Sequence, residues 1–168
     1  MELVTTTELF VGQCRYLLTI AEGMLDDLRD EHAHLEPVPG NKTAGWLLGH
    51  LCITGDFARR LCGRPAICPK EWRTTFRPGT TATSEATMYP PMDDLTSKFR
   101  EVYTDLCDAA ITPDEASLSA PNPFEAARAA FPTGREFVPY IMTGHLAYHL
   151  GQLGDWRRAA GLGHKSHL

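Results

Sequence analysis

Apolar residues recur at steps of three and four positions along four segments of the chain, and polar residues fill most of the positions between them. This spacing places the apolar side chains on one face of an α-helix. The pattern predicts helices over about residues 7–29, 42–61, 92–111 and 134–160. No segment shows the apolar–polar alternation that is typical of a β-strand, and the sequence contains no internal repeat.

Helix-start signals precede two of these segments. Thr5 and Glu8 have the spacing of a capping box, as do Thr133 and Glu136, and in such a box the two side chains bond each other's backbone amides. Pro139 lies inside the last predicted helix, where proline removes a hydrogen bond and clashes with the preceding turn. We therefore expect either a kink at Pro139 or a helix that begins just before it.

The segments between the predicted helices differ in length. Residues 30–41 form a short link, whereas residues 62–91 are rich in Thr, Pro and Gly and long enough to cross over a bundle. Residues 112–133 have room for one short helix at about 124–130. Four amphipathic helices with long crossover connections predict an all-α fold, a four-helix bundle. The length of 168 residues predicts a single domain over 1–168.

Composition and charge narrow the function classes. Hydrophobic residues make up 43% of the chain and charged residues 22%, which favours a packed core over disorder. The net charge of −5 argues against a nucleic-acid partner, and no apolar run approaches the roughly 20 residues needed to span a membrane. The five cysteines form no C-x-x-C pair, and the N-terminus lacks a signal-peptide pattern. We therefore expect a cytoplasmic protein with free thiols.

Three histidines fall on the apolar faces of the predicted helices. His50 lies in the second helix, and His145 and His149 lie four residues apart in the fourth, so both imidazoles project from one face. Such a pair and a third imidazole from a facing helix can bind one metal ion. Periodicity alone leaves two explanations open, a shared metal site and histidines that hydrogen-bond within the core.

Two familiar metal-site patterns are excluded. His145 and His149 have the H-x-x-x-H spacing, but Leu146 stands where a metalloprotease needs its general-base Glu. The Glu-x-x-His pairs of di-iron carboxylate bundles are also missing. A mononuclear site with nitrogen ligands remains, and three protein ligands would leave one coordination position open for a thiol or a water.

Glycines are unusually frequent in the two histidine-bearing helices. Each costs about 1 kcal/mol relative to Ala in a helix interior, so their number needs a reason. Close helix approach around a small polar centre is one explanation, and a tight apolar crossing is the other. The glycines concerned are Gly45, Gly49, Gly55, Gly144, Gly151 and Gly154.

Three polar residues near the histidines are candidates for a role in chemistry. Gln152 lies one turn beyond His149 on the same face, where it could hydrogen-bond a bound water or substrate or be a satisfied polar core residue. Tyr148 could donate a proton, or it could point toward the third helix. Asp56 is six residues from His50 on a partly different face, and we expect it at the surface.

Other candidates are expected to stay outside the site. Cys52 lies about 200° around the predicted helix from the nearest histidine and is not expected to be a ligand. Arg157 and Arg158 suit the negative end of the last helix dipole. His164 and His167 lie in a C-terminal tail that we expect to be frayed and able to bind nickel adventitiously.

The residues around the three histidines resemble a known family. Gly45-Trp-Leu-Leu-Gly-His50-Leu and Gly144-His-Leu-Ala-Tyr-His149-Leu-Gly-Gln-Leu153 are similar to motifs of the DinB-like superfamily of metal-binding four-helix bundles, and the similarity extends over about residues 5–161. The resemblance implies that His50, His145 and His149 bind a divalent metal ion, zinc, nickel or iron, and that the chain forms a homodimer. Members with known activity include thiol S-transferases that use low-molecular-weight thiols and a thiol-dependent maleylpyruvate isomerase, and related domains serve in ergothioneine biosynthesis.

Two function classes follow from the residues and the resemblance together. The first is a metal-dependent enzyme, an S-transferase or a hydrolase, that activates a thiol or a water against a small-molecule substrate. The second is a metal-binding or stress-related bundle protein without turnover. A pocket over the histidines, lined by residues 62–91 and 112–133, would favour the enzyme, whereas a fourth protein ligand would favour the second class.

Overall fold

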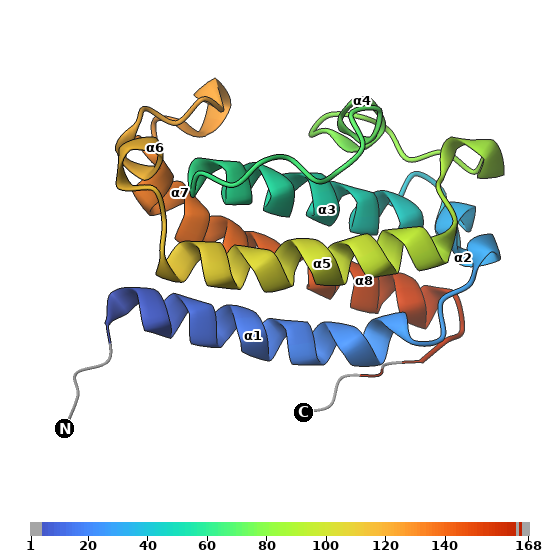
Figure 1. Cartoon of the computed structure of the whole chain (residues 1–168). Helices are drawn as coiled ribbons and strands as arrows, with labels where there is room; N and C mark the ends of the chain where they lie inside the picture. The colour runs from blue at the N-terminus through green and yellow to red at the C-terminus, as the bar shows by residue number, and fades with distance from the viewer. Residues whose placement is uncertain (1–4, 164, 166–168) are drawn as a thin grey trace.

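Four long helical rods make up the protein (Figure 1). The structure, a computed structural model, describes residues 5–163 and 165. Its described part contains no strand, and Pro121 and Thr133 form an isolated β-bridge. The predicted all-α four-helix bundle is therefore confirmed. The rods are α1 (Thr6–Leu25), α3 (Ala44–Leu61), α5 (Met92–Ile111) and a composite of α7 (Gly134–Tyr140), the π-helical turn η3 (Ile141–His145) and α8 (Leu146–Ala159).

Short helices occupy the links between the rods. The link after α5 contains a helix that the pattern did not predict and only one 3₁₀ turn where a short helix was expected. None of the described helices is both long and apolar enough to cross a membrane. The short elements are α2 (Asp30–His34), α4 (Trp72–Phe76), η1 (Ala86–Met88), α6 (Glu115–Ser119) and η2 (Glu125–Ala127).

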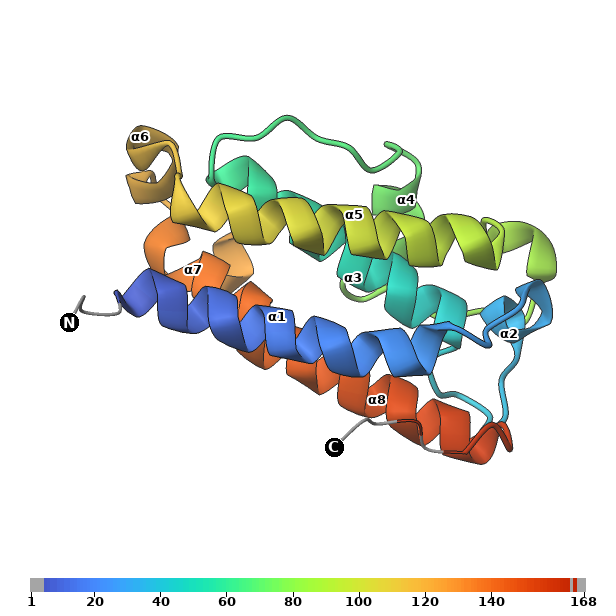
Figure 2. The ribbon, with the colours of Figure 1, turned by 60° about the horizontal axis from the view of Figure 1, so that its bottom comes forward.

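The direction of the rods explains why one link is long. In Figure 1, α1 and α8 run one way, and α3 and α5 run the other. Since α3 and α5 are parallel neighbours, the chain must return along the bundle between them. Residues 62–91, called the crossover below, make this return over the outside of α3 and α5 and carry α4 (Figure 2).

The predicted caps start the helices as expected. The backbone N–H of Thr5 donates to Glu8 Oε2 at 2.6 Å, and the N–H of Glu8 donates to Thr5 Oγ1 at 3.2 Å. A second capping box, built by Thr133 and Glu136, starts α7. These reciprocal bonds satisfy amide groups that have no partner within the helix.

Pro139 changes the pitch of the fourth rod without ending it. The rod begins at Gly134 and passes through Pro139, and the next turn, Ile141–His145, is π-helical. Proline cannot donate an amide hydrogen bond and its ring crowds the turn before it, so a wider turn relieves the mismatch. Thr143 Oγ1 donates to the Pro139 carbonyl at 2.7 Å. Because the π turn ends at His145, it sets the direction of that side chain.

A buried ion pair fastens the end of α8 to α1. The guanidinium of Arg157 is fully buried and donates to both carboxylate oxygens of Asp27, at 2.6 and 3.0 Å. It also donates to the Met24 carbonyl at 2.7 Å. The Arg157 hydrogen bonds hold the pKa of Asp27 well below its usual range. Arg157 therefore does more than complement a helix dipole, because it closes the bundle at this end.

Candidate metal centre

The three histidines converge between α3 and the fourth rod. One ring nitrogen from each of His50, His145 and His149 lies within 4.8 Å of the others. The Nε2 atoms of His50 and His145 are 3.2 Å apart, and the centroids of the His145 and His149 rings are 4.5 Å apart. Among residues 5–163 and 165, this is the one group of His, Cys, Asp or Glu side chains with a metal-binding arrangement.

Hydrogen bonds fix two of the rings so that Nε2 faces the centre. His50 Nδ1 lies 2.8 Å from the Phe76 carbonyl, and His149 Nδ1 lies 2.7 Å from Gln152 Oε1. Both oxygens only accept hydrogen bonds, so each Nδ1 carries the proton and each Nε2 keeps a lone pair. Such outer partners are typical of histidines that bind metal ions.

His145 completes the set and carries an unsatisfied polar atom. Its Nδ1 is buried and has no hydrogen-bond partner. Its Nε2 faces His50 Nε2 at 3.2 Å, a distance at which two lone pairs repel unless a proton or a cation lies between them. Three imidazole nitrogens in one place are a donor set that zinc, nickel and iron ions accept. The residues present therefore fit a divalent metal ion.

Burial keeps the three imidazoles neutral at pH 7. It lowers the pKa of His50 to about 4 and that of His145 to about 3, and it also lowers the pKa of His149. A neutral imidazole is the form that binds a metal ion, because the protonated ring has no free lone pair.

The crossover holds His50 in place from outside α3. The Trp46 ring stacks on His50, with centroids 4.8 Å apart and the planes 9° apart, and Trp46 Nε1 donates to Thr80 Oγ1 at 2.9 Å. A Cβ added at Gly49 would lie 2.4 Å from the Phe76 ring. Gly49 is therefore required by the close approach of the crossover. This reason differs from the two that were expected for the helix glycines, close helix approach around a polar centre and a tight apolar crossing.

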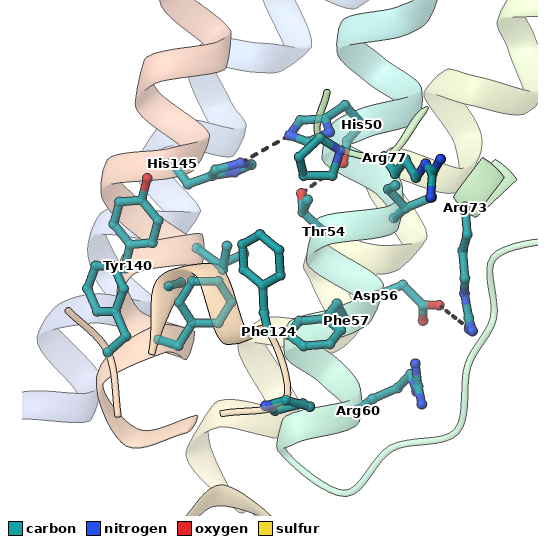
Figure 3. A pocket seen from close by; sticks show the side chains of 17 residues that line it. His50, Thr54, Asp56, Phe57, Arg60, Arg73, Arg77, Phe124, Tyr140 and His145 are labelled. Atoms are coloured by element: carbon teal, nitrogen blue, oxygen red, sulfur yellow. Dashed lines mark hydrogen bonds and ion pairs between the residues drawn. The ribbon is translucent and has the colours of Figure 1, made fainter. Parts of the chain in front are cut away.

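A cavity of about 490 Å³ opens beside His50 and His145 (Figure 3). Its walls come from α3, α7 and η3 and from both long links, including Arg73 and Arg77 of the crossover and Phe124 of the link after α5. Pockets of this size and apolar lining are typical of small-molecule sites. The histidine cluster thus has one side that faces a cavity.

Gln152 and Tyr148 lie on the other side of the cluster. Besides accepting from His149, Gln152 donates through Nε2 to the Tyr148 hydroxyl at 3.3 Å. Tyr148 is 63% exposed and does not line the cavity, and its ring meets the His149 ring edge-on at 5.1 Å. Their roles in chemistry stay predictions, whereas the hydrogen bond from His149 gives Gln152 a definite positioning contact.

The expectation of a surface position for Asp56 is wrong. The residue is 1% exposed, accepts from Arg59 Nη1 at 2.8 Å and accepts from the backbone amides of Ile67 and Cys68 at 3.1 and 3.3 Å. The reason is that the first residues of the crossover cover this face of α3. Arg59, three residues along the helix, was the signal that could have marked Asp56 as a paired, buried carboxylate.

The remaining candidates lie away from the centre. Cys52 is buried and its thiol faces the Leu95 carbonyl at 3.6 Å, and burial raises its pKa. His164 and His167 lie outside the described residues. The Phe76 carbonyl, which holds His50, was not predicted, because a backbone atom from a long link leaves no mark in a residue pattern.

Comparison with known families agrees with this geometry. The family model of the DinB superfamily matches residues 17–153, a range that contains His50, His145 and His149. The comparisons with curated proteins and with solved structures found no match. The matched range covers most of the chain, including α3, α5 and the part of the fourth rod that carries two of the histidines. The chain belongs to the DinB superfamily.

Proposed function

We propose that the protein is a metal-dependent enzyme in which His50, His145 and His149 bind one zinc, nickel or iron ion. The open side of the ion would face the cavity and activate a thiol or a water against a small-molecule substrate. Transfer of a low-molecular-weight thiol is the more specific form of this proposal. The observation that carries it is the cavity of about 490 Å³ beside His50 and His145.

The number of ligands supports an enzyme over a metal-storage role. Structural and storage sites are usually closed by a fourth protein ligand, whereas catalytic sites keep a position open. Among the described residues, the cluster holds three histidines and no carboxylate or thiol. Both long links contribute to the cavity wall, which is the arrangement expected of a substrate pocket.

The chain's own residues would bind the ion, orient the histidine rings and shield the cavity from water. A divalent ion, when bound, supplies the positive charge that lowers the pKa of a coordinated thiol or water toward neutrality. The Phe76 carbonyl and Gln152 keep the Nε2 lone pairs of His50 and His149 directed inward. A substrate seated against the aromatic cavity wall would displace water from it, which would strengthen electrostatic interactions inside. Gln152 would orient a bound thiol or water, and Tyr148 would donate a proton, only at a second open position of the ion, because neither side chain lines the cavity.

Metal content tests the metal centre directly. We expect about one ion per full-length chain by mass spectrometry, in a background with His164 and His167 replaced by alanine so that the tail binds no nickel. His149→Ala should lose the ion because two imidazoles rarely retain it, and His34→Ala, in α2, serves as the matched control. Circular dichroism would show that both variants fold. Metal retained by His149→Ala as tightly as by the parent contradicts the proposal.

Turnover tests the enzymatic part separately. Cysteine or glutathione and chlorodinitrobenzene should react faster with the metal-loaded protein than with protein treated with a chelator. An ion bound without any acceleration, across a panel of thiols and electrophiles, would favour the non-catalytic metal-binding function. The homodimer expected from the family resemblance stays a prediction that sedimentation equilibrium can check.

A further inference from the structure

The cavity beside the histidines has two walls of different chemistry (Figure 3). Aromatic rings, among them Phe124 and Tyr140, form the wall on the side of α7 and the link after α5. Guanidinium groups form the opposite wall, with Arg60 at the end of α3 and Arg73 and Arg77 on the crossover. An occupant that touches both walls would meet apolar surface on one side and positive charge on the other.

The arginine wall, formed by Arg60, Arg73 and Arg77, carries positive charge that carboxylates neutralise only in part. Within the described residues, Arg60 and Arg77 have no carboxylate partner. Arg73 lies 4.0 Å from Asp56 Oδ2, but Asp56 is already bonded by Arg59 and by two backbone amides. Three arginines therefore line the cavity, and only Arg73 lies near a carboxylate, which is otherwise satisfied, on a chain whose net charge is −5. Such a local surplus attracts an anion.

We propose that this cavity binds a small aromatic carboxylic acid, with its ring against the aromatic wall and its carboxylate on Arg73 and Arg77. The proposal rests on the proposed function and names the class of its electrophilic substrate. A planar guanidinium matches a carboxylate with two parallel hydrogen bonds. Aromatic side chains favour a ring-shaped body through offset or edge-to-face packing.

The position of the histidines fits this orientation. His50 and His145 line the same cavity as the arginines, with Thr54 one turn beyond His50 on α3. A carboxylate held by the crossover would leave the other end of the ring free to approach the cluster. The acid group is therefore the anchor, and the aromatic wall selects the shape.

Binding of naphthoate to the metal-free protein tests the arginine wall. Calorimetry in the presence of a chelator removes any ion that could attract the carboxylate. We expect naphthoate to bind more tightly than its neutral analogue naphthylmethanol, and acetate, which has no ring, to bind much more weakly. Arg77→Gln and Arg73→Gln should each weaken the binding of naphthoate about tenfold, since a charge-assisted hydrogen bond is lost. The affinity for naphthylmethanol should not change.

Matched variants separate charge from shape. Arg15→Gln removes the same charge from an exposed position on α1 outside the cavity and should leave naphthoate affinity unchanged. Phe124→Ala shortens the aromatic wall at a residue that is 40% exposed. It should weaken the binding of naphthoate and of naphthylmethanol equally. Thermal melts of all four variants report that they fold.

Three results would overturn the proposal. Equal affinity of the parent for naphthoate and naphthylmethanol would show that the arginines recognise no carboxylate. Unchanged naphthoate affinity in both Arg73→Gln and Arg77→Gln would also show that these arginines do not bind the carboxylate. Binding that occurs only after metal is added, and that ignores the arginines, would place the carboxylate on the ion instead. Loss of the metal centre, measured on His149→Ala, is a separate result and leaves the chelator-treated binding assay readable.

Discussion

Single side chains around the histidines decide which ring nitrogens face the centre. Gln152 accepts from His149 Nδ1 through one amide atom and donates to Tyr148 through the other. The amide can therefore satisfy His149 only when that ring carries its proton on Nδ1. The consequence is that Gln152 prepares a ligand before any ion arrives.

Gln152→Leu should weaken metal binding about tenfold or more, because His149 loses the partner that fixes its tautomer and ring angle. Competition with a fluorescent zinc chelator measures this affinity. Tyr148→Phe is the matched control, since it removes the hydroxyl that Gln152 donates to and leaves the bond to His149 in place. Equal affinities of Gln152→Leu and the parent would show that the hydrogen bond does not position His149.

At the scale of the elements, the fit between α3 and the crossover is the critical contact. Phe76 is fully buried against Gly49, and its carbonyl accepts from the next residue along α3, His50. The packing of Phe76 on Gly49 and the hydrogen bond of its carbonyl with His50 are thus parts of one contact. Displacement of Phe76 would release His50 as well.

Gly49→Ala should therefore lower the free energy of unfolding by about 2 kcal/mol, as overpacking of a tight interior does, and should also weaken metal binding. Gly151→Ala is the matched control, because nothing lies within 4 Å of an added Cβ there and alanine favours a helix by about 1 kcal/mol. Urea unfolding and metal titration of both variants provide the readouts. A Gly49→Ala protein as stable as Gly151→Ala would mean that Phe76 moves aside without cost.

Helix periodicity predicted the four rods well and the crossover poorly. The third predicted helix has the observed bounds of α5, Met92–Ile111, because its apolar stripe is regular and the prolines before and after it, Pro90, Pro91 and Pro113, mark its ends. Helix geometry places His145 and His149 on one face. It left open whether His50 shares a site with them, and the family resemblance implied that they do. The Phe76 carbonyl, the burial of Asp56 and the arginine wall depend on how an irregular segment folds back over α3. That return is decided by tertiary packing, which leaves no periodic trace.

At the scale of the whole molecule, the pair of Arg157 and Asp27 joins the last rod to the first. Removal of a partner from a buried pair leaves the other charge uncompensated. Asp27→Asn should therefore cost about 2 kcal/mol of unfolding free energy at pH 7. Asp155→Asn, which breaks an exposed pair with Arg158, is the matched control and should cost little.

The same pair makes stability depend on pH. The pKa of Asp27 is lowered in the folded protein. The contribution of Asp27 to the free energy of unfolding is therefore complete above the ordinary pKa of about 4, and it is lost as the pH falls from there toward the lowered pKa. The parent should lose stability between about pH 4 and pH 2 more steeply than Asp27→Asn, and the two should converge at the acidic end. Urea unfolding across that range measures the difference. Parallel curves for the two proteins would show that Asp27 keeps its ordinary pKa.

Metal binding should also raise the thermal unfolding temperature of the whole bundle. His50 and His145 are 95 residues apart, so only the folded chain brings the three rings together. A ligand that binds only the native state stabilises it by mass action. Differential scanning calorimetry with added zinc should show the increase in the parent and none in His149→Ala. An equal increase in both would place the ion elsewhere.

The crossover has one further consequence, for how the ligand preference of the cavity could be changed. It contributes Arg73 and Arg77 to the cavity from outside the four rods, and neither residue belongs to the buried interior. Replacement of these two side chains would therefore change the ligand proposed for the cavity, while the scaffold and its three imidazoles stay constant. Within the crossover, the buried Phe76 serves the fold and the exposed Arg73 and Arg77 serve the cavity, so a change at the arginines leaves the packing of the segment intact.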